Sequence, residues 1–202
     1  MKSIYTTLFC FLSIWSVANA QTANLSGQIF LNSDSVTVLS SVVVVLRNDA
    51  GDALETTETA EFGRYEFSNL ATGETYEIQP IREGDDLNGI STFDMVLIQQ
   101  HILGRNEFDR PLQLIAADLS NSQTVSTLDM VQMRQLILGI TDELPNERAS
   151  WTFVRSTITF ANPNNPFDGI ANNDFTINLT EDVSDFNFTG VKIGDVNGSA
   201  AP

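Results

Sequence analysis

Within the short stretch of residues 118–129, five of the oxygen-bearing side chains have a spacing that suits metal binding. They occupy positions 1, 3, 5, 7 and 12 of the stretch, and an apolar residue occupies position 8. A 12-residue calcium loop takes side-chain oxygens from positions 1, 3, 5 and 12 and a backbone carbonyl from position 7, because Ca²⁺ is a hard cation that prefers oxygen. The predicted ligands are Asp118, Ser120, Ser122, Thr124 and Asp129.

Two features of this stretch bear on the predicted calcium loop. Only two of the ligands are carboxylates, and Gln123 stands at the turn position that usually needs glycine, so we expect weak binding of the extracellular kind. In addition, Ser126 and Asp129 form the pattern of a capping box, which starts a helix without any metal. Capping does not explain the alternating oxygens at Asp118, Ser120 and Ser122, and we therefore favour a calcium loop.

The segment that follows this stretch has a duplicate earlier in the chain. Residues 91–104 align with residues 126–139, and nine of the 14 aligned residues are identical. Apolar residues recur with helical spacing in each copy, and each copy closes on a glycine, which commonly ends a helix. Because a helix of about a dozen residues is marginal alone, the repeat predicts two short antiparallel helices that pack on each other.

The loop before the first copy departs from the calcium pattern. It is one residue short, and Leu87 stands where a side-chain oxygen is needed, so its remaining candidate ligands are Asp85, Asn88 and Asp94. Near the C-terminus, Asp195 and Asn197 open a similar stretch that no helix follows. We hypothesise that these two residues fold back and complete the first loop; a dead first site and a plain polar turn at the chain end are the alternatives.

Strand patterns lie on both sides of the repeat. Residues 42–46 form an unbroken apolar run typical of a strand covered on both faces, and residues 63–67 and 75–78 alternate between polar and apolar. Short strands separated by turns predict a small antiparallel β-sandwich before the repeat. Similar alternation within residues 151–193 predicts a β-rich C-terminal region.

The first of these regions resembles a known kind of secreted domain. The spacing of glycine, aromatic and aliphatic residues from Gly63 through Tyr65 and Phe67 to Ile78 is similar to carboxypeptidase-regulatory-like and Cna-B-like β-sandwich modules. This resemblance implies a stalk or spacer, with carbohydrate binding in some relatives. A purely structural sandwich is the simpler interpretation, because the aromatics alternate as core residues do.

The repeat resembles type I dockerin modules from about Asp85 to Gly139, since each predicted loop is followed by one helix that ends in Leu-Gly. The resemblance implies that calcium folds the loops and that the helix faces bind a cohesin-like extracellular protein. An ordinary solvent-exposed helix face is the alternative. The positions matching the family's partner contacts are Thr92, Phe93, Gln99 and Gln100 in the first copy and Thr127, Leu128, Arg134 and Gln135 in the second.

Composition and the N-terminus indicate an exported acidic protein. The chain has 202 residues with 10 Lys and Arg against 26 Asp and Glu, so its net charge of −16 disfavours nucleic acid and anionic lipid as partners. Residues 1–20 have the pattern of a cleavable signal peptide, and their apolar run is too short to span a bilayer. With one His, one Cys and no nucleotide-binding or metalloprotease motif, we expect no catalytic centre.

The sequence therefore predicts an α+β multidomain protein. Its parts are a signal peptide at 1–20, a carboxypeptidase-regulatory-like or Cna-B-like sandwich at 21–80, a dockerin-like duplicated loop–helix module at 81–145 and a β-rich C-terminal region at 146–202. We expect a secreted or cell-surface, non-catalytic, calcium-binding interaction module with no membrane span after signal cleavage. The alternatives are a structural surface stalk or adhesin segment, and a polysaccharide-binding protein that acts through the sandwich.

Overall fold

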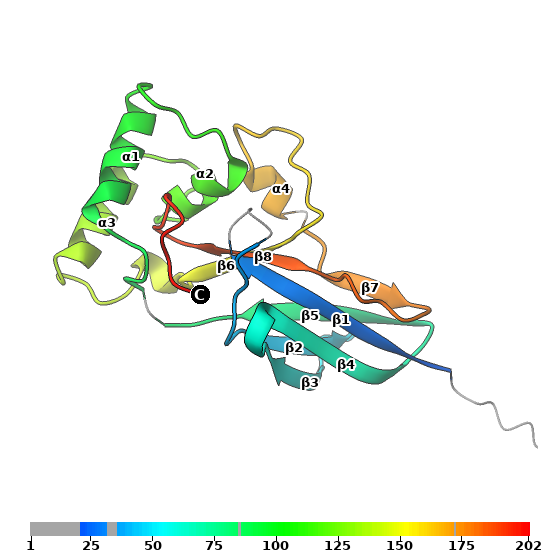
Figure 1. Cartoon of the computed structure of the whole chain (residues 1–202). Helices are drawn as coiled ribbons and strands as arrows, with labels where there is room; N and C mark the ends of the chain where they lie inside the picture. The colour runs from blue at the N-terminus through cyan, green and yellow to red at the C-terminus, as the bar shows by residue number, and fades with distance from the viewer. Residues whose placement is uncertain (1–20, 32–35, 85, 172) are drawn as a thin grey trace, which may run out of the picture.

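The computed structural model describes residues 21–31, 36–84, 86–171 and 173–202, and the predicted signal peptide and Asp85 lie outside these residues. Within them, strands form two four-stranded sheets, in the orders β4-β1-β8-β6 and β3-β2-β5-β7 (Figure 1). The strands are β1 Thr22–Leu31, β2 Val43–Asn48, β3 Ala53–Glu58, β4 Arg64–Ala71, β5 Glu74–Ile81, β6 Trp151–Arg155, β7 Thr176–Leu179 and β8 Phe188–Lys192.

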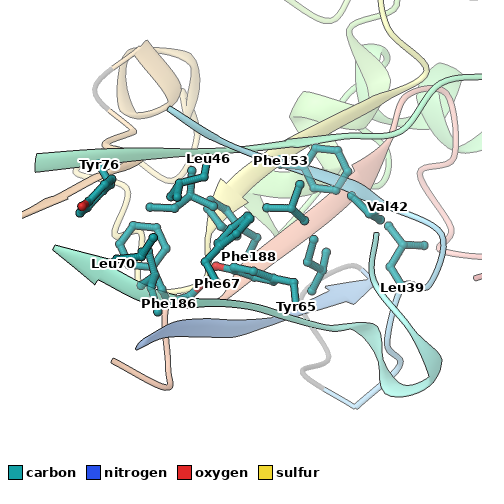
Figure 2. Packing of buried hydrophobic residues seen from close by; sticks show 14 of the residues in the cluster. Leu39, Val42, Leu46, Tyr65, Phe67, Leu70, Tyr76, Phe153, Phe186 and Phe188 are labelled. Atoms are coloured by element: carbon teal, nitrogen blue, oxygen red, sulfur yellow. Dashed lines mark hydrogen bonds between the residues drawn. The ribbon is translucent and has the colours of Figure 1, made fainter. Parts of the chain in front are cut away.

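The two sheets pack face to face around an aromatic core. Along β1, buried and more exposed side chains alternate, as expected for a strand with one face on a core. The side chains of Tyr65, Phe67, Phe186 and Phe188 meet between the layers (Figure 2), with the rings of Phe186 and Phe188 edge to face at 5.6 Å. The structure is thus an α+β fold with β-sandwich character.

The sandwich is built from both ends of the described chain. Strand β8 pairs with β1 in parallel, with Ile29 opposite Phe188, and β7 pairs antiparallel with β5. Strands β6, β7 and β8 therefore belong to the same two sheets as β1 to β5, and the sandwich is not wholly antiparallel. The physical reason is that β1 and β5 would otherwise expose unpaired backbone N–H and C=O groups along an edge.

Four α-helices lie in the described part of the chain, and two of them match the repeat. These two, α1 Thr92–Ile102 and α3 Thr127–Ile137, pack against each other. The sequence patterns did not predict α2 Pro111–Ala117 or α4 Phe167–Ala171. None of the helices described is long and apolar enough to cross a lipid bilayer.

A second apolar cluster joins the helices to the sandwich. Ile98 of α1, Ile115 of α2 and Met133 of α3 are buried together with Val191 and Ile193, at and just after the end of β8. Side chains of β8 therefore face both ways, toward the aromatic core and toward the helices. The chain then continues from β8 along the helices to its C-terminus (Figure 1), with Gly194 N–H donating to the carbonyl of Ala116 at 2.8 Å.

Candidate functional site

The continuous loop between α2 and α3 is organised around the carboxylate of Asp118. This side chain is only 1% exposed and follows directly on the end of α2. Its Oδ1 accepts hydrogen bonds from Ser122 N–H at 2.9 Å and from the Ser120 hydroxyl at 3.2 Å. Its Oδ2 accepts from Gln123 N–H at 2.9 Å. The backbone at positions 5 and 6 of the loop therefore wraps around the side chain at position 1.

Asp129, at position 12, closes the same loop from the start of α3 and is fully buried. Its Oδ2 accepts from the backbone and hydroxyl of Ser126 at 2.8 and 3.0 Å, which forms the capping box of α3. Its Oδ1 turns into the loop and accepts from Ser120 N–H at 2.9 Å. Ser120 thus links the carboxylates of Asp118 and Asp129. Asp129 uses one oxygen to cap α3 and the other to close the loop.

The remaining predicted ligands of this loop lie on its exposed side. The Ser122 hydroxyl contacts the carbonyl of Thr124 at 3.2 Å and the Thr124 hydroxyl at 3.0 Å. Gln123 adopts a left-handed backbone with φ 62°, the conformation that glycine usually supplies at this position. The loop therefore keeps its tight turn at the cost of local strain.

The C-terminal segment forms the first half of a second loop around Asp195. This carboxylate is buried, and its Oδ1 accepts from Gly198 N–H at 2.9 Å and Ser199 N–H at 3.0 Å. Its Oδ2 accepts from Ala200 N–H at 2.8 Å. If Asp195 is counted as position 1, the donors at positions 5 and 6 are the same as those around Asp118.

The second half of this loop is the start of α1. Asp94 is fully buried; its Oδ2 accepts from the backbone and hydroxyl of Ser91 at 2.9 and 2.8 Å in a capping box. Its Oδ1 accepts from Val196 N–H at 3.1 Å and from Asn197 N–H at 3.2 Å. The bond from position 3 to position 12 therefore recurs, although here the two residues are far apart in sequence. We call the arrangement of residues 88–94 and 195–201 the split loop, and that of residues 118–129 the continuous loop.

Asn88, a predicted ligand, contacts the C-terminal segment through its side chain. Its side-chain oxygen accepts from Ala201 N–H at 2.9 Å, and its amide donates to the Ala201 carbonyl at 3.0 Å. The Ser199 hydroxyl donates to the carbonyl of Gly89 at 3.1 Å. Asn88 therefore holds the C-terminal segment in place. Asp85, the other early ligand predicted, lies outside the described residues.

The two loops differ in the charges around them. Burial raises the pKa of Asp195; the N–H groups of Ala200, Ser199 and Gly198 lower it, and the charge of Asp94 raises it further. Asn197 Oδ1, at position 3 of the split loop, is buried and has no hydrogen-bond partner among the described residues. Next to the continuous loop, Arg148 Nη1 lies 3.9 Å from Asp118 Oδ2.

Sequence reasoning missed Arg148, because no local pattern ties it to the loop.

Among the described residues, no three His, Cys, Asp or Glu side chains gather as a metal centre. Each loop has only two carboxylates and would depend on hydroxyl, amide and carbonyl oxygens for the rest of a coordination shell.

The predicted partner-contact positions have the same exposure in both helices. In each copy the first three positions are exposed and the last is partly buried. Apolar residues next to them are exposed in equivalent pairs, Val96 with Val131 and Leu103 with Leu138. By contrast, the sandwich aromatics Tyr65, Tyr76 and Trp151 are buried, whereas Phe62, just before β4, is 69% exposed.

No known protein family matches this chain, and no curated protein is significantly similar to it. Two pilus proteins of known structure are similar over part of it. The C-terminal fragment of the pilus adhesin SpaC from Lactobacillus rhamnosus GG is 20% identical, with a TM-score of 0.27 over 33% of this chain and 25% of that one. The group B streptococcus pilus 2b backbone protein is 15% identical, with a TM-score of 0.24 over 35% and 36%. The chain thus spans only a quarter to about a third of these proteins, and the likeness assigns neither family nor function.

Proposed function

We propose that this chain is a secreted, non-catalytic interaction module in which calcium, bound in dockerin-like loops, holds the helical part together. The carrying observation is that one pattern of hydrogen bonds recurs in two loops of different connectivity. In both, position 3 donates to the carboxylate at position 12, and positions 5 and 6 donate to the carboxylate at position 1. A capping box accounts for Asp94 and Asp129 but not for Asp118 and Asp195.

The donor sets suit a weak calcium site. Calcium takes six to eight oxygens in flexible geometry, and extracellular modules bind it at roughly 10⁻⁴–10⁻³ M. In the split loop, the backbone of Asn197 donates to Asp94, and the charge of Asp94 acts on Asp195. Asn197 Oδ1, buried without a hydrogen-bond partner among the described residues, is an oxygen of the kind that calcium accepts. A calcium ion there would offset the repulsion between the two buried carboxylates.

The paired apolar residues on α1 and α3 support a role in binding. Phe93 and Leu128 are 57% and 51% exposed at equivalent positions of the repeat. Exposed apolar residues that recur on neighbouring helices are typical of protein contact surfaces. We therefore propose a cohesin-like or other extracellular protein as the partner, and calcium as the ion that fixes the two helices for it.

A structural surface segment is the second candidate, and one observation favours it. Every carboxylate oxygen of Asp94, Asp118, Asp129 and Asp195 already accepts a hydrogen bond from the protein. The loops can therefore close without a cation, and the shared sandwich core would make a stable stalk element.

Thermal unfolding distinguishes the two. We expect calcium to raise the unfolding temperature relative to EDTA, with about 2.7 kcal/mol of stabilisation when free calcium is about 100 times its Kd. The double variant Asp118→Asn/Asp195→Asn should lose this response, and Asp109→Asn, at an 89% exposed side chain, should keep it. Equal unfolding temperatures in calcium and in EDTA would instead support the structural segment.

A further inference from the structure

Arg148 lies against the continuous loop from outside it. It caps the 3₁₀ turn Pro145–Glu147, just before β6. Its side chain is 13% exposed, and its Nη1 lies 3.9 Å from Asp118 Oδ2. A guanidinium stays charged even when buried, so a fixed positive charge stands at the edge of this loop.

Both carboxylates of the continuous loop interact with this charge. Burial lowers the pKa of Arg148, and the charges of Asp118 and Asp129 oppose that shift. Nη1 is buried without a hydrogen-bond partner among the described residues. Nη1, the nitrogen 3.9 Å from Asp118 Oδ2, therefore acts on the loop through its charge and not as a hydrogen-bond donor.

In the split loop, the pKa of Asp195 is set by burial, by backbone N–H groups and by the charge of Asp94. The donors to Asp94 and Asp195 there are backbone N–H groups and serine hydroxyls. Lys192, the buried cation closest to it in sequence, donates its Nζ to the carbonyls of Asp86 and Ile193. The two loops thus share one hydrogen-bond pattern, but the charge of Arg148 acts on both carboxylates of the continuous loop, whereas the charge that acts on Asp195 is that of Asp94.

We propose that Arg148 takes the electrostatic place of the cation in the continuous loop, so that calcium binds first, and more tightly, in the split loop. This inference rests on the proposed calcium-binding function. A divalent cation entering the continuous loop would be repelled by the guanidinium, and like charges a few ångströms apart in a partly buried setting interact strongly. Arg148 therefore decides which of two similar loops is occupied.

Calcium titration by calorimetry tests this inference. We expect one site in the wild-type protein, and Asp195→Asn should abolish it. Arg148→Met keeps an unbranched side chain and removes the charge; it should strengthen binding at the continuous loop at least tenfold and bring a second site into view. Arg148→Lys, which keeps the charge, should behave like the wild type.

A second measurement leaves Arg148 in place, so that the test does not depend on whether the Arg148 variants fold. In the wild-type background, Asp118→Asn should leave the number and affinity of bound calcium ions unchanged. Two sites of equal affinity in the wild type, or a loss of binding in Asp118→Asn, would overturn the role of Arg148 while leaving calcium binding intact. Absence of binding in every protein, Arg148→Met included, would overturn the proposed function itself.

Discussion

The backbone N–H of Asn197 donates a 3.2 Å hydrogen bond to the carboxylate of Asp94, across a sequence separation of 103 residues. Its counterpart in the continuous loop, from Ser120 N–H to Asp129, spans a separation of nine. The same contact therefore forms both in a loop made of one short segment and in a loop whose two halves lie far apart in the sequence. Through the split loop, the residues after β8 are fastened to the first helix.

Replacing Asp195 by Asn should loosen the C-terminal segment even without calcium. The amide keeps one acceptor oxygen, so at least one of the three backbone donors loses its partner inside the protein, at a cost of about 1–3 kcal/mol. Urea unfolding in EDTA measures the loss. Asp109→Asn, a change at an exposed carboxylate, should stay within about 0.5 kcal/mol of the wild type; equal effects of the two variants would contradict the fastening role.

Gly89→Ala should displace the same segment by sterics. Gly89 has φ +74°, and a Cβ there would lie 2.6 Å from Ala200 N. Gly51→Ala is the matched control, because Gly51 has φ +85° with no atom within 4 Å of the added carbon. Both variants place an alanine in a left-handed backbone conformation, which destabilises the protein by about 1–2 kcal/mol. Only Gly89→Ala adds a steric clash, which costs about 1–3 kcal/mol more. Faster amide exchange at Ala200 and Ala201 in Gly89→Ala alone would report the displacement.

The free energy of unfolding should fall as the pH drops below neutral, because His101 then becomes protonated. Burial lowers the pKa of this imidazole from its usual value, the charge of Glu107 opposes the shift, and Nδ1 accepts a 3.1 Å bond from Phe108 N–H. The folded state thus favours the neutral ring, so its contribution is complete above about pH 6.5 and is lost as the pH falls through the lowered pKa.

The variant His101→Asn isolates this effect, because its amide oxygen can accept the same bond without titrating. Urea unfolding of both proteins between about pH 5 and pH 7.5 should give a flatter profile for His101→Asn. Parallel profiles would show that other groups cause the dependence.

The outer face of α1 should tolerate polar substitution. Val96 is exposed whereas Ile98, two residues on, is fully buried in the cluster between the helices and the sandwich. Val96→Ser should change stability by no more than about 0.5 kcal/mol, and Ile98→Ala should cost about 2–5 kcal/mol. A large loss for Val96→Ser in unfolding experiments would mean that this face already packs against the chain and is not free for a partner.

Several features could be predicted from sequence because they depend on contacts between residues that are close together in the sequence. The capping boxes that start α1 and α3 each join residues three apart, Ser91 with Asp94 and Ser126 with Asp129, so the repeat marks both helix starts. The turn through Gln123 is local in the same way. In contrast, α2 has only seven residues, and α4 has five, too few to show a helical period.

What the sequence alone determined is the inventory of parts: alternating strands, a duplicated helix with its caps, and carboxylates at set positions. The tertiary structure decided how they join. The parallel pairing of β1 with β8 and the approach of Arg148 to Asp118 each bring together segments that no local pattern links. The sequence offered the folding back of Asp195 and Asn197 only as a hypothesis, and the tertiary structure supplies the contacts that hold residues 195–201 on α1. They form because unpaired strand edges, buried charges and unsatisfied N–H groups find partners through space, wherever along the chain those partners lie.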